Sequence, residues 1–156
     1  MSNPISIVEN LLKTNSLHQV SFNGITTHLF ESQNLQKEQA AFSGHGYWKE
    51  SWVVIGKENL NNDPFVIDSA LPGFPVFTAM LGEELTDGKK SWEASVVSPS
   101  YENFLASLKL VDQYSKKKAP SEKEETHILD KLEELNEDNE CYFWEDWIIE
   151  NTDEED

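Results

Sequence analysis

A series of short apolar segments between Trp52 and Leu105 limits the possible fold more than any other feature of this chain. Turn residues such as Asp63-Pro64 and Pro72-Gly73 separate the segments, a pattern typical of buried strands joined by tight connections. The expected strands are 52–55, ending at Gly56, then 64–68, 74–80 and 91–97. Strands followed by helices predict a single α+β domain, with helices packed around a mainly antiparallel sheet.

A hairpin is expected before these strands. Asn23-Gly24 is the preferred pair for a two-residue turn with positive φ, and it separates the apolar segments 17–22 and 25–30. This turn should place Phe22 opposite Ile25 and Val20 opposite Thr27.

Helix boundaries follow from capping residues. Ser98-Pro99 can begin a helix in which Tyr101, Phe104, Leu105, Leu108 and Val111 recur at helical spacing. Ser121 and Glu124 form a capping box for a second helix, whose apolar face carries Ile128, Leu129, Leu132 and Leu135. Further helices are expected at 4–15 and 36–42, and a compact aromatic element at 141–149. We expect one domain over residues 1–150 and an acidic tail over 151–156.

Length and composition favour a soluble cytoplasmic protein. A chain of 156 residues suits one domain with a single core. No apolar run approaches the roughly 18–20 residues that span a bilayer. The first ten residues include Glu9 and no basic residue, unlike a secretory signal. The single cysteine, Cys141, has no partner for an internal disulfide.

Negative charge is concentrated towards the C-terminus. The formal net charge is −17, with 29 acidic residues and 12 basic residues that are all lysine. Residues 121–156 hold 16 of the acids and 2 lysines, a net charge of −14. Such a segment repels nucleic acid and anionic membranes and attracts basic surfaces. The lack of arginine also removes the usual bidentate ligand of phosphate and guanine. We therefore expect a basic protein partner and no nucleic-acid or membrane partner.

Candidate catalytic residues give weak signals. The histidines, His18, His28, His45 and His127, are far apart and lack the spacing of metal ligands. Cys141 lies among aromatic residues, where desolvation would keep the thiol protonated and unreactive. Asp63 and Asp68 can be interpreted as a catalytic carboxylate pair or as ordinary turn residues, and the second interpretation is favoured. We predict no catalytic residue, no cofactor and no metal site.

Five tryptophans indicate a large aromatic core and, near the C-terminus, a possible interface. Trp52 and Trp92, with Phe104, are expected in the core. Aromatic anchors inside an acidic rim suit recognition of a basic protein, whereas an amphipathic helix could instead pack the same rings on the sheet. The candidate partner-binding residues are Glu140, Trp144, Glu145, Asp146, Trp147 and Glu150.

Residues 52–105 resemble the core of the SUKH superfamily in the order and spacing of their segments. The matching features are a strand closing in Ile55-Gly56, the Asp63-Pro64 turn before Val66-Ile67-Asp68, the Pro75-Val76-Phe77 strand, Trp92, and a Ser-Pro-Ser helix start before Phe104-Leu105. The resemblance implies helices around a mainly antiparallel sheet. It carries over no catalytic residues and no individual partner-binding residues.

The superfamily includes bacterial toxin-immunity proteins and a fungal cell-wall assembly regulator, so the resemblance implies a binding protein. The first hypothesis is an immunity protein that neutralises a cognate toxin, a nuclease or another basic domain, by occlusion; a negative charge complements such a partner. The second is a regulatory adaptor of the fungal type. The third is an enzyme that uses Asp63, Asp68 or a histidine. A toxin-like domain encoded by a neighbouring gene would favour the first.

Overall fold

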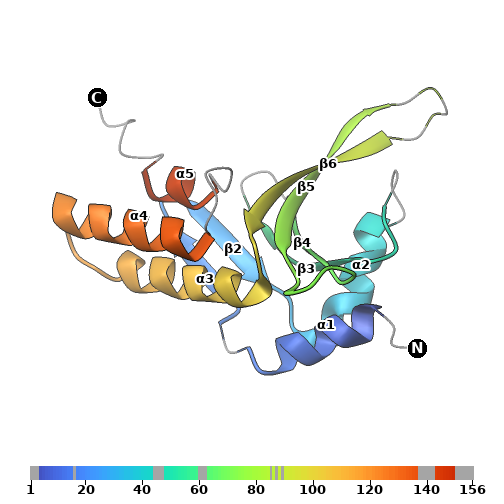
Figure 1. The fold of residues 1–156 in the computed structure, drawn as a ribbon, viewed down its shortest axis with the longest axis horizontal. Helices are drawn as coiled ribbons and strands as arrows, with labels where there is room; N and C mark the ends of the chain where they lie inside the picture. Colours follow the sequence, from blue (N-terminus) through green and yellow to red (C-terminus); the bar gives the residue numbers. More distant parts are fainter. Residues whose placement is uncertain are drawn as a thin grey trace.

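Six antiparallel strands form one sheet, and within the described residues five α-helices pack against it (Figure 1). The computed structural model describes residues 4–15, 17–43, 48–59, 63–84, 90–136 and 143–149, together with Thr86 and Gly88. The strands lie in the sheet in chain order: β1 (Gln19–Phe22), β2 (Ile25–Leu29), β3 (Trp52–Glu58), β4 (Pro64–Asp68), β5 (Val76–Glu84) and β6 (Lys90–Ser98). The predicted α+β fold is confirmed.

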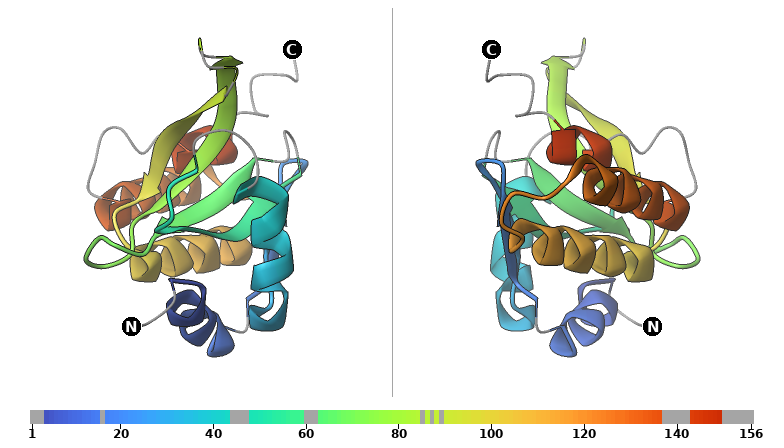
Figure 2. Two further views of the ribbon diagram at one scale, coloured as in Figure 1. Left: turned by 90° about the vertical axis from the view of Figure 1, so that its right-hand side faces the viewer. Right: turned by 90° about the vertical axis from the view of Figure 1, so that its left-hand side faces the viewer.

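The helices fall close to the positions that the capping residues predict. They are α1 (Pro4–Lys13), α2 (Leu35–Ser43), α3 (Tyr101–Ser115), α4 (Glu122–Asn136) and α5 (Phe143–Ile149), with the short 3-10 helix η1 (Ser32–Asn34) before α2. Figure 2 shows α3, α4 and α5 gathered on one side of the sheet and α1 with α2 beside β3.

The β1–β2 hairpin has the predicted register. Asn23 and Gly24 adopt φ angles of 51° and 79°, which the two-residue turn requires. Phe22 pairs with Ile25, and Val20 pairs with Thr27. The hairpin joins the main sheet through β2 and β3, so the chain has one continuous sheet.

Both faces of the central strands are covered, which explains their continuous apolar sequence. Neighbouring residues of a strand point to opposite faces, so Phe65 and Val66 point in opposite directions. The Phe65 ring lies 5.4 Å from the rings of Phe104 in α3 and Phe143 in α5. On the opposite face, Val66 pairs with Phe77, whose ring lies 4.8 Å from that of Trp52.

Several boundaries differ from the sequence prediction: the strand expected at 74–80, for example, spans Val76–Glu84. Helix α3 begins at Tyr101, not at Ser98-Pro99, because Ser100 is the N-cap and its hydroxyl accepts a hydrogen bond from the Asn103 N–H. Ser98 is the last residue of β6 and is fully buried. Strand β3 continues past Gly56, where a Cβ would collide with the carbonyl oxygen of His28. Glycine therefore permits close pairing with β2 at that position.

The predicted core is confirmed for Trp52 and Phe104, which are 7% and 0% exposed. Trp92 is only partly buried and packs against the edge of the core. Among the described strands, β6 is the last of the sheet, so no further described strand lies beside Trp92 on that side. The placement of Trp92 as a full core residue was wrong for this reason.

Candidate partner-binding surfaces

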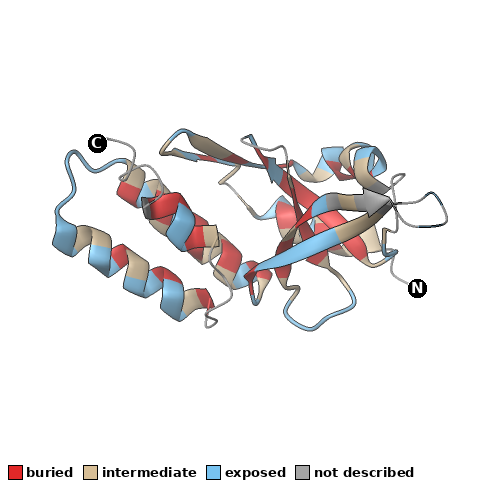
Figure 3. Cartoon of the chain, turned by 90° about the horizontal axis from the view of Figure 1, so that it is seen from above, coloured by how far each residue is buried: buried red, intermediate tan, exposed pale blue. Residues whose placement is uncertain are grey.

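Exposed carboxylates on the outer sides of α4 and α5 form an acidic surface. Figure 3 shows the alternation along α4, with buried residues towards the core and exposed residues outside. Ile128, Leu132 and Asn136 occupy the buried side, and the acidic residues on the opposite side of α4 face solvent. Among the described residues, we define the acidic surface as Glu122, Asp130, Glu133, Glu134, Glu145 and Asp146.

The first turn of α4 is fixed by the predicted capping box. The Ser121 hydroxyl accepts from the Glu124 N–H at 3.1 Å, and Glu124 Oε1 accepts from the Ser121 N–H at 3.2 Å. Lys117 Nζ lies 2.7 Å from Glu124 Oε2. The hydrogen bond with Lys117, and then that with the Ser121 backbone, hold the pKa of Glu124 below its usual value. The box and the ion pair set where α4 begins relative to α3.

A buried polar network fixes the other end of α4. The Ser98 hydroxyl donates to Asn136 Oδ1, and Asn136 Nδ2 donates to the Ser107 hydroxyl at 3.1 Å and to the Leu132 carbonyl at 2.7 Å. All three polar side chains are at most 1% exposed. The network connects β6, α3 and α4, and its hydrogen bonds form only at one position of α4 relative to α3.

The tryptophans of α5 are core residues, which corrects the interpretation of Trp144 and Trp147 as exposed anchors. Each is 1% exposed. Trp144 Nε1 donates to the Val97 carbonyl and Trp147 Nε1 to the Phe22 carbonyl, both at 2.8 Å. Packing the two large rings against the sheet removes their apolar surface from water, which favours the buried position.

Of the four acidic residues next to those tryptophans, the structure describes two. Glu145 and Asp146 are exposed and belong to the acidic surface. Glu140 and Glu150 lie outside the described residues, as do Cys141 and His45. Helix α5 is also held by the hairpin turn, because Asn23 Nδ2 donates to the carbonyls of Trp147 and Ile148 at 2.9 and 3.0 Å.

Asp63 and Asp68 do not form a catalytic pair. They flank β4 at opposite ends, roughly 16 Å apart at the usual rise per strand residue. Asp68 accepts from the Ala70 N–H in a local turn. The neighbour of Asp63 is Glu58, whose Oε1 accepts from the Asp63 N–H at 3.1 Å. Burial, and then the charge of Glu58, raise the pKa of Asp63.

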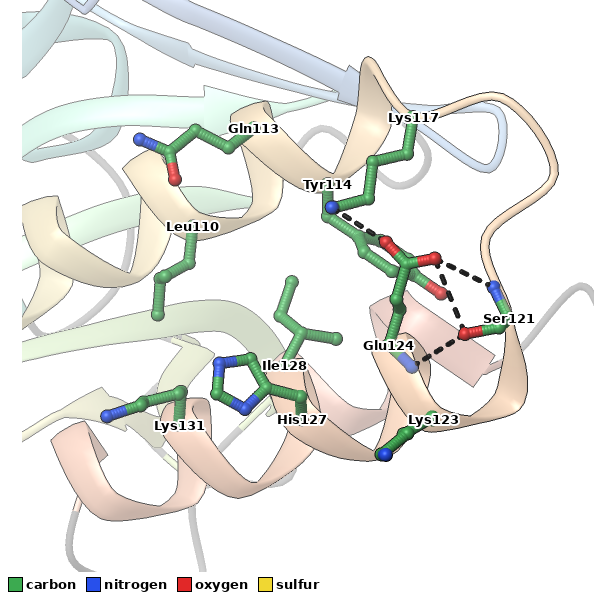
Figure 4. Close-up of a pocket in the computed structure, with 10 residues that line it drawn as sticks. All are labelled: Leu110, Gln113, Tyr114, Lys117, Ser121, Lys123, Glu124, His127, Ile128 and Lys131. Atoms are coloured by element: carbon green, nitrogen blue, oxygen red, sulfur yellow. Dashed lines mark hydrogen bonds and ion pairs between the residues drawn. The ribbon is translucent and has the colours of Figure 1, made fainter.

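A groove of about 460 Å³ lies between α3 and α4 (Figure 4). Leu110 and Tyr114 of α3 and Ile128 of α4 provide its apolar lining, and Lys123, His127 and Lys131 follow one another along α4. The sequence does not predict this α3–α4 groove, because its two sides come from different helices. The i, i+4, i+8 spacing of the three basic residues was the available signal.

An aromatic cluster on the other sheet face was also missed. The Trp48 ring lies 5.2 Å from that of Trp52, 5.1 Å from that of Trp92 and 6.4 Å from that of Phe42. Trp48 Nε1 donates to the Trp52 carbonyl at 3.1 Å. Through Trp52, the cluster also contacts Phe77, which lies on the sheet face opposite α3.

Metal and membrane features give two further findings. Among the described residues, no three His, Cys, Asp or Glu side chains lie close enough to hold a metal ion. No helix in the described part of the chain is long and apolar enough to cross a membrane.

No protein-family model matches the chain, and no curated protein or solved structure matches it at a significant level.

Proposed function

We propose that this protein is an immunity protein that binds a cognate toxin domain with a basic surface and occludes its active site. The observation that carries the proposal is the acidic surface of α4 and α5, in a chain with a net charge of −17. The resemblance of residues 52–105 to the SUKH core supports the immunity role. A nuclease domain is a suitable class of partner, because nucleases need basic surfaces to hold nucleic acid.

The carboxylates of the acidic surface are held on a rigid support, which favours protein binding. Its carboxylates are carried by helices whose inner sides are fixed by the capping box, by the Asn136 network and by the buried rings of α5. Rigid support lowers the entropy lost when a partner binds. Complementary charge raises the rate of encounter, and exposed carboxylates are also available for direct pairing with lysine or arginine.

Co-expression tests the proposal. A candidate toxin domain encoded by a neighbouring gene is expressed in a bacterial host alone, with this protein, or with a variant in which the acidic surface is neutralised. We expect protection by the native protein, a purified complex of the two chains, and weaker protection by the variant. A folded native protein that neither protects the host nor binds the purified toxin domain would overturn the proposal.

A further inference from the structure

The charge of the α3–α4 groove is opposite to that of the molecule. Lys123, His127 and Lys131 lie along one side of α4, and the first and last are about 12 Å apart at the helical rise. Glu124 is the one carboxylate among the lining residues. Its oxygens are engaged by Lys117 and Ser121. The groove therefore has a positive edge in a chain with a net charge of −17.

Lys123 and Lys131 are available to a ligand. The ion pairs between described residues join Lys116 to Asp112 and Lys117 to Glu124, and neither involves Lys123 or Lys131. Both lysines are exposed. Along α4, Glu122 and Glu124 flank Lys123, and Asp130 precedes Lys131. Of these acids, Glu124 lines the groove, and its carboxylate is paired with Lys117. The lining therefore carries Lys123 and Lys131 in addition to the Lys117–Glu124 pair.

The remaining lining is apolar. Leu110, the Tyr114 ring and Ile128 form the floor between the helices, and Ile128 is 5% exposed. Burial raises the pKa of Tyr114, so its hydroxyl stays neutral at pH 7. A fully ionic ligand such as phosphate would leave this floor in water, whereas a ligand with an apolar body would cover it.

We propose that the α3–α4 groove binds an amphiphilic monocarboxylate. The carboxylate lies at Lys131 and His127, and the aliphatic or aromatic body lies over Leu110, Ile128 and the Tyr114 ring. The volume of about 460 Å³ is within the range of small-molecule sites and too small for a partner helix. This site is separate from the acidic surface, and its occupation does not depend on the toxin.

Decanoate, below its micelle concentration, is the probe. Titration of the labelled full chain by two-dimensional NMR should give saturable shifts confined to α3 and α4 around the groove. Decanol, which has the same chain without the charge, should bind more weakly. Acetate, which has the charge without the chain, should give no saturable shifts. Saturable shifts that instead cluster on the aromatic rings of Trp48 and Trp92 would overturn the proposal.

Charge reversal tests the role of Lys131. Lys131→Glu should weaken decanoate binding about tenfold, equal to about 1.4 kcal/mol. Lys37→Glu, an exposed lysine on α2, makes the same charge change far from the groove and should leave the affinity unchanged. Equal effects of the two substitutions would show a response to net charge only and would overturn the site.

Filling the groove tests the role of its floor. Leu110→Trp should abolish saturable decanoate binding while circular dichroism and thermal midpoint stay close to those of the native chain. If that variant does not fold, the comparison of Lys131→Glu with Lys37→Glu decides alone. A folded Leu110→Trp protein that binds decanoate as tightly as the native chain would also overturn the proposal.

Discussion

The side-chain amide of Gln39 is hydrogen-bonded to Val54 in the way that a neighbouring strand would be. Gln39 Oε1 accepts from the Val54 N–H at 2.8 Å, and Gln39 Nε2 donates to the Trp52 carbonyl at 2.6 Å. Strand β2 pairs with β3 only from Gly56 onwards, apart from the hydrogen bond from Phe30 to Ile55. Gln39 therefore completes the hydrogen bonding of the first part of β3.

Gln39→Ala should destabilise the fold by about 1–3 kcal/mol, because the buried Val54 N–H loses its acceptor. The Trp52 carbonyl keeps its hydrogen bond from Trp48 Nε1. Gln36→Ala, at an exposed position of the same helix, is the matched control and should change stability by less than about 0.5 kcal/mol. Urea unfolding measures both. Equal midpoints for the two variants would contradict the role of Gln39.

Asn136→Ala should cost about 1–3 kcal/mol, because the buried Ser98 hydroxyl loses its acceptor. The Ser107 hydroxyl loses its donor and keeps its hydrogen bond to the Asn103 carbonyl. Removing all three polar groups, as Ser98→Ala, Ser107→Ala and Asn136→Ala together, should cost less than the sum of the single changes. Chemical denaturation of the four variants measures this coupling. Strict additivity would mean that the three side chains do not act as one network.

Trp147→Ala should destabilise the fold by about 3–5 kcal/mol, the usual range for truncating a buried large aromatic side chain. Trp147→Phe should cost about 1 kcal/mol, mainly through loss of the hydrogen bond to the Phe22 carbonyl. Trp92→Ala should cost only about 1–2 kcal/mol, because the Trp92 ring is partly exposed. Thermal and urea unfolding decide the order. A larger loss for Trp92→Ala than for Trp147→Ala would be inconsistent with the structure.

Asp63→Asn should stabilise the protein slightly at pH 7, by less than about 1 kcal/mol because solvent screens a partly exposed charge. Burial, and then Glu58, raise the pKa of Asp63 above 3.8 in the folded state. Stability from protonated Asp63 is therefore complete below its unfolded pKa and is lost as pH rises through its folded pKa. The advantage of Asp63→Asn should vanish below about pH 3.8. Unfolding curves from pH 3 to 7 measure it, and a constant difference would contradict the shift.

If the proposed toxin domain binds at the acidic surface, neutralising Glu134, Glu145 and Asp146 should slow its association at low salt and change its dissociation rate little. Complementary charge acts mainly on encounter. Neutralising Glu31, Glu50 and Glu93 removes the same charge from exposed positions outside the acidic surface and is the matched control. The difference between the two sets should shrink near 0.1 M salt, where the screening length is about 10 Å. Equal slowing by both sets would assign the effect to net charge alone.

Local chemistry determined much of the fold. The Asn23-Gly24 turn set the hairpin register, because few residue pairs accept two positive φ angles. Ser121 and Glu124 set the start of α4, since both partners of the capping box lie within one turn. The apolar runs of β3 and β4 indicated strands buried on both faces.

Tertiary packing decided what those local signals leave open. The sequence allowed Trp144 and Trp147 to be exposed anchors or core residues. In the structure both rings are buried, and their indole N–H groups donate to the carbonyls of Val97 and Phe22. Ser98 could have capped a helix, but the distant Asn136 holds it in β6. The α3–α4 groove needs two helices at a fixed separation. The sequence alone determines turns and caps because their partners are neighbours in the chain, whereas burial depends on contacts between residues far apart in it.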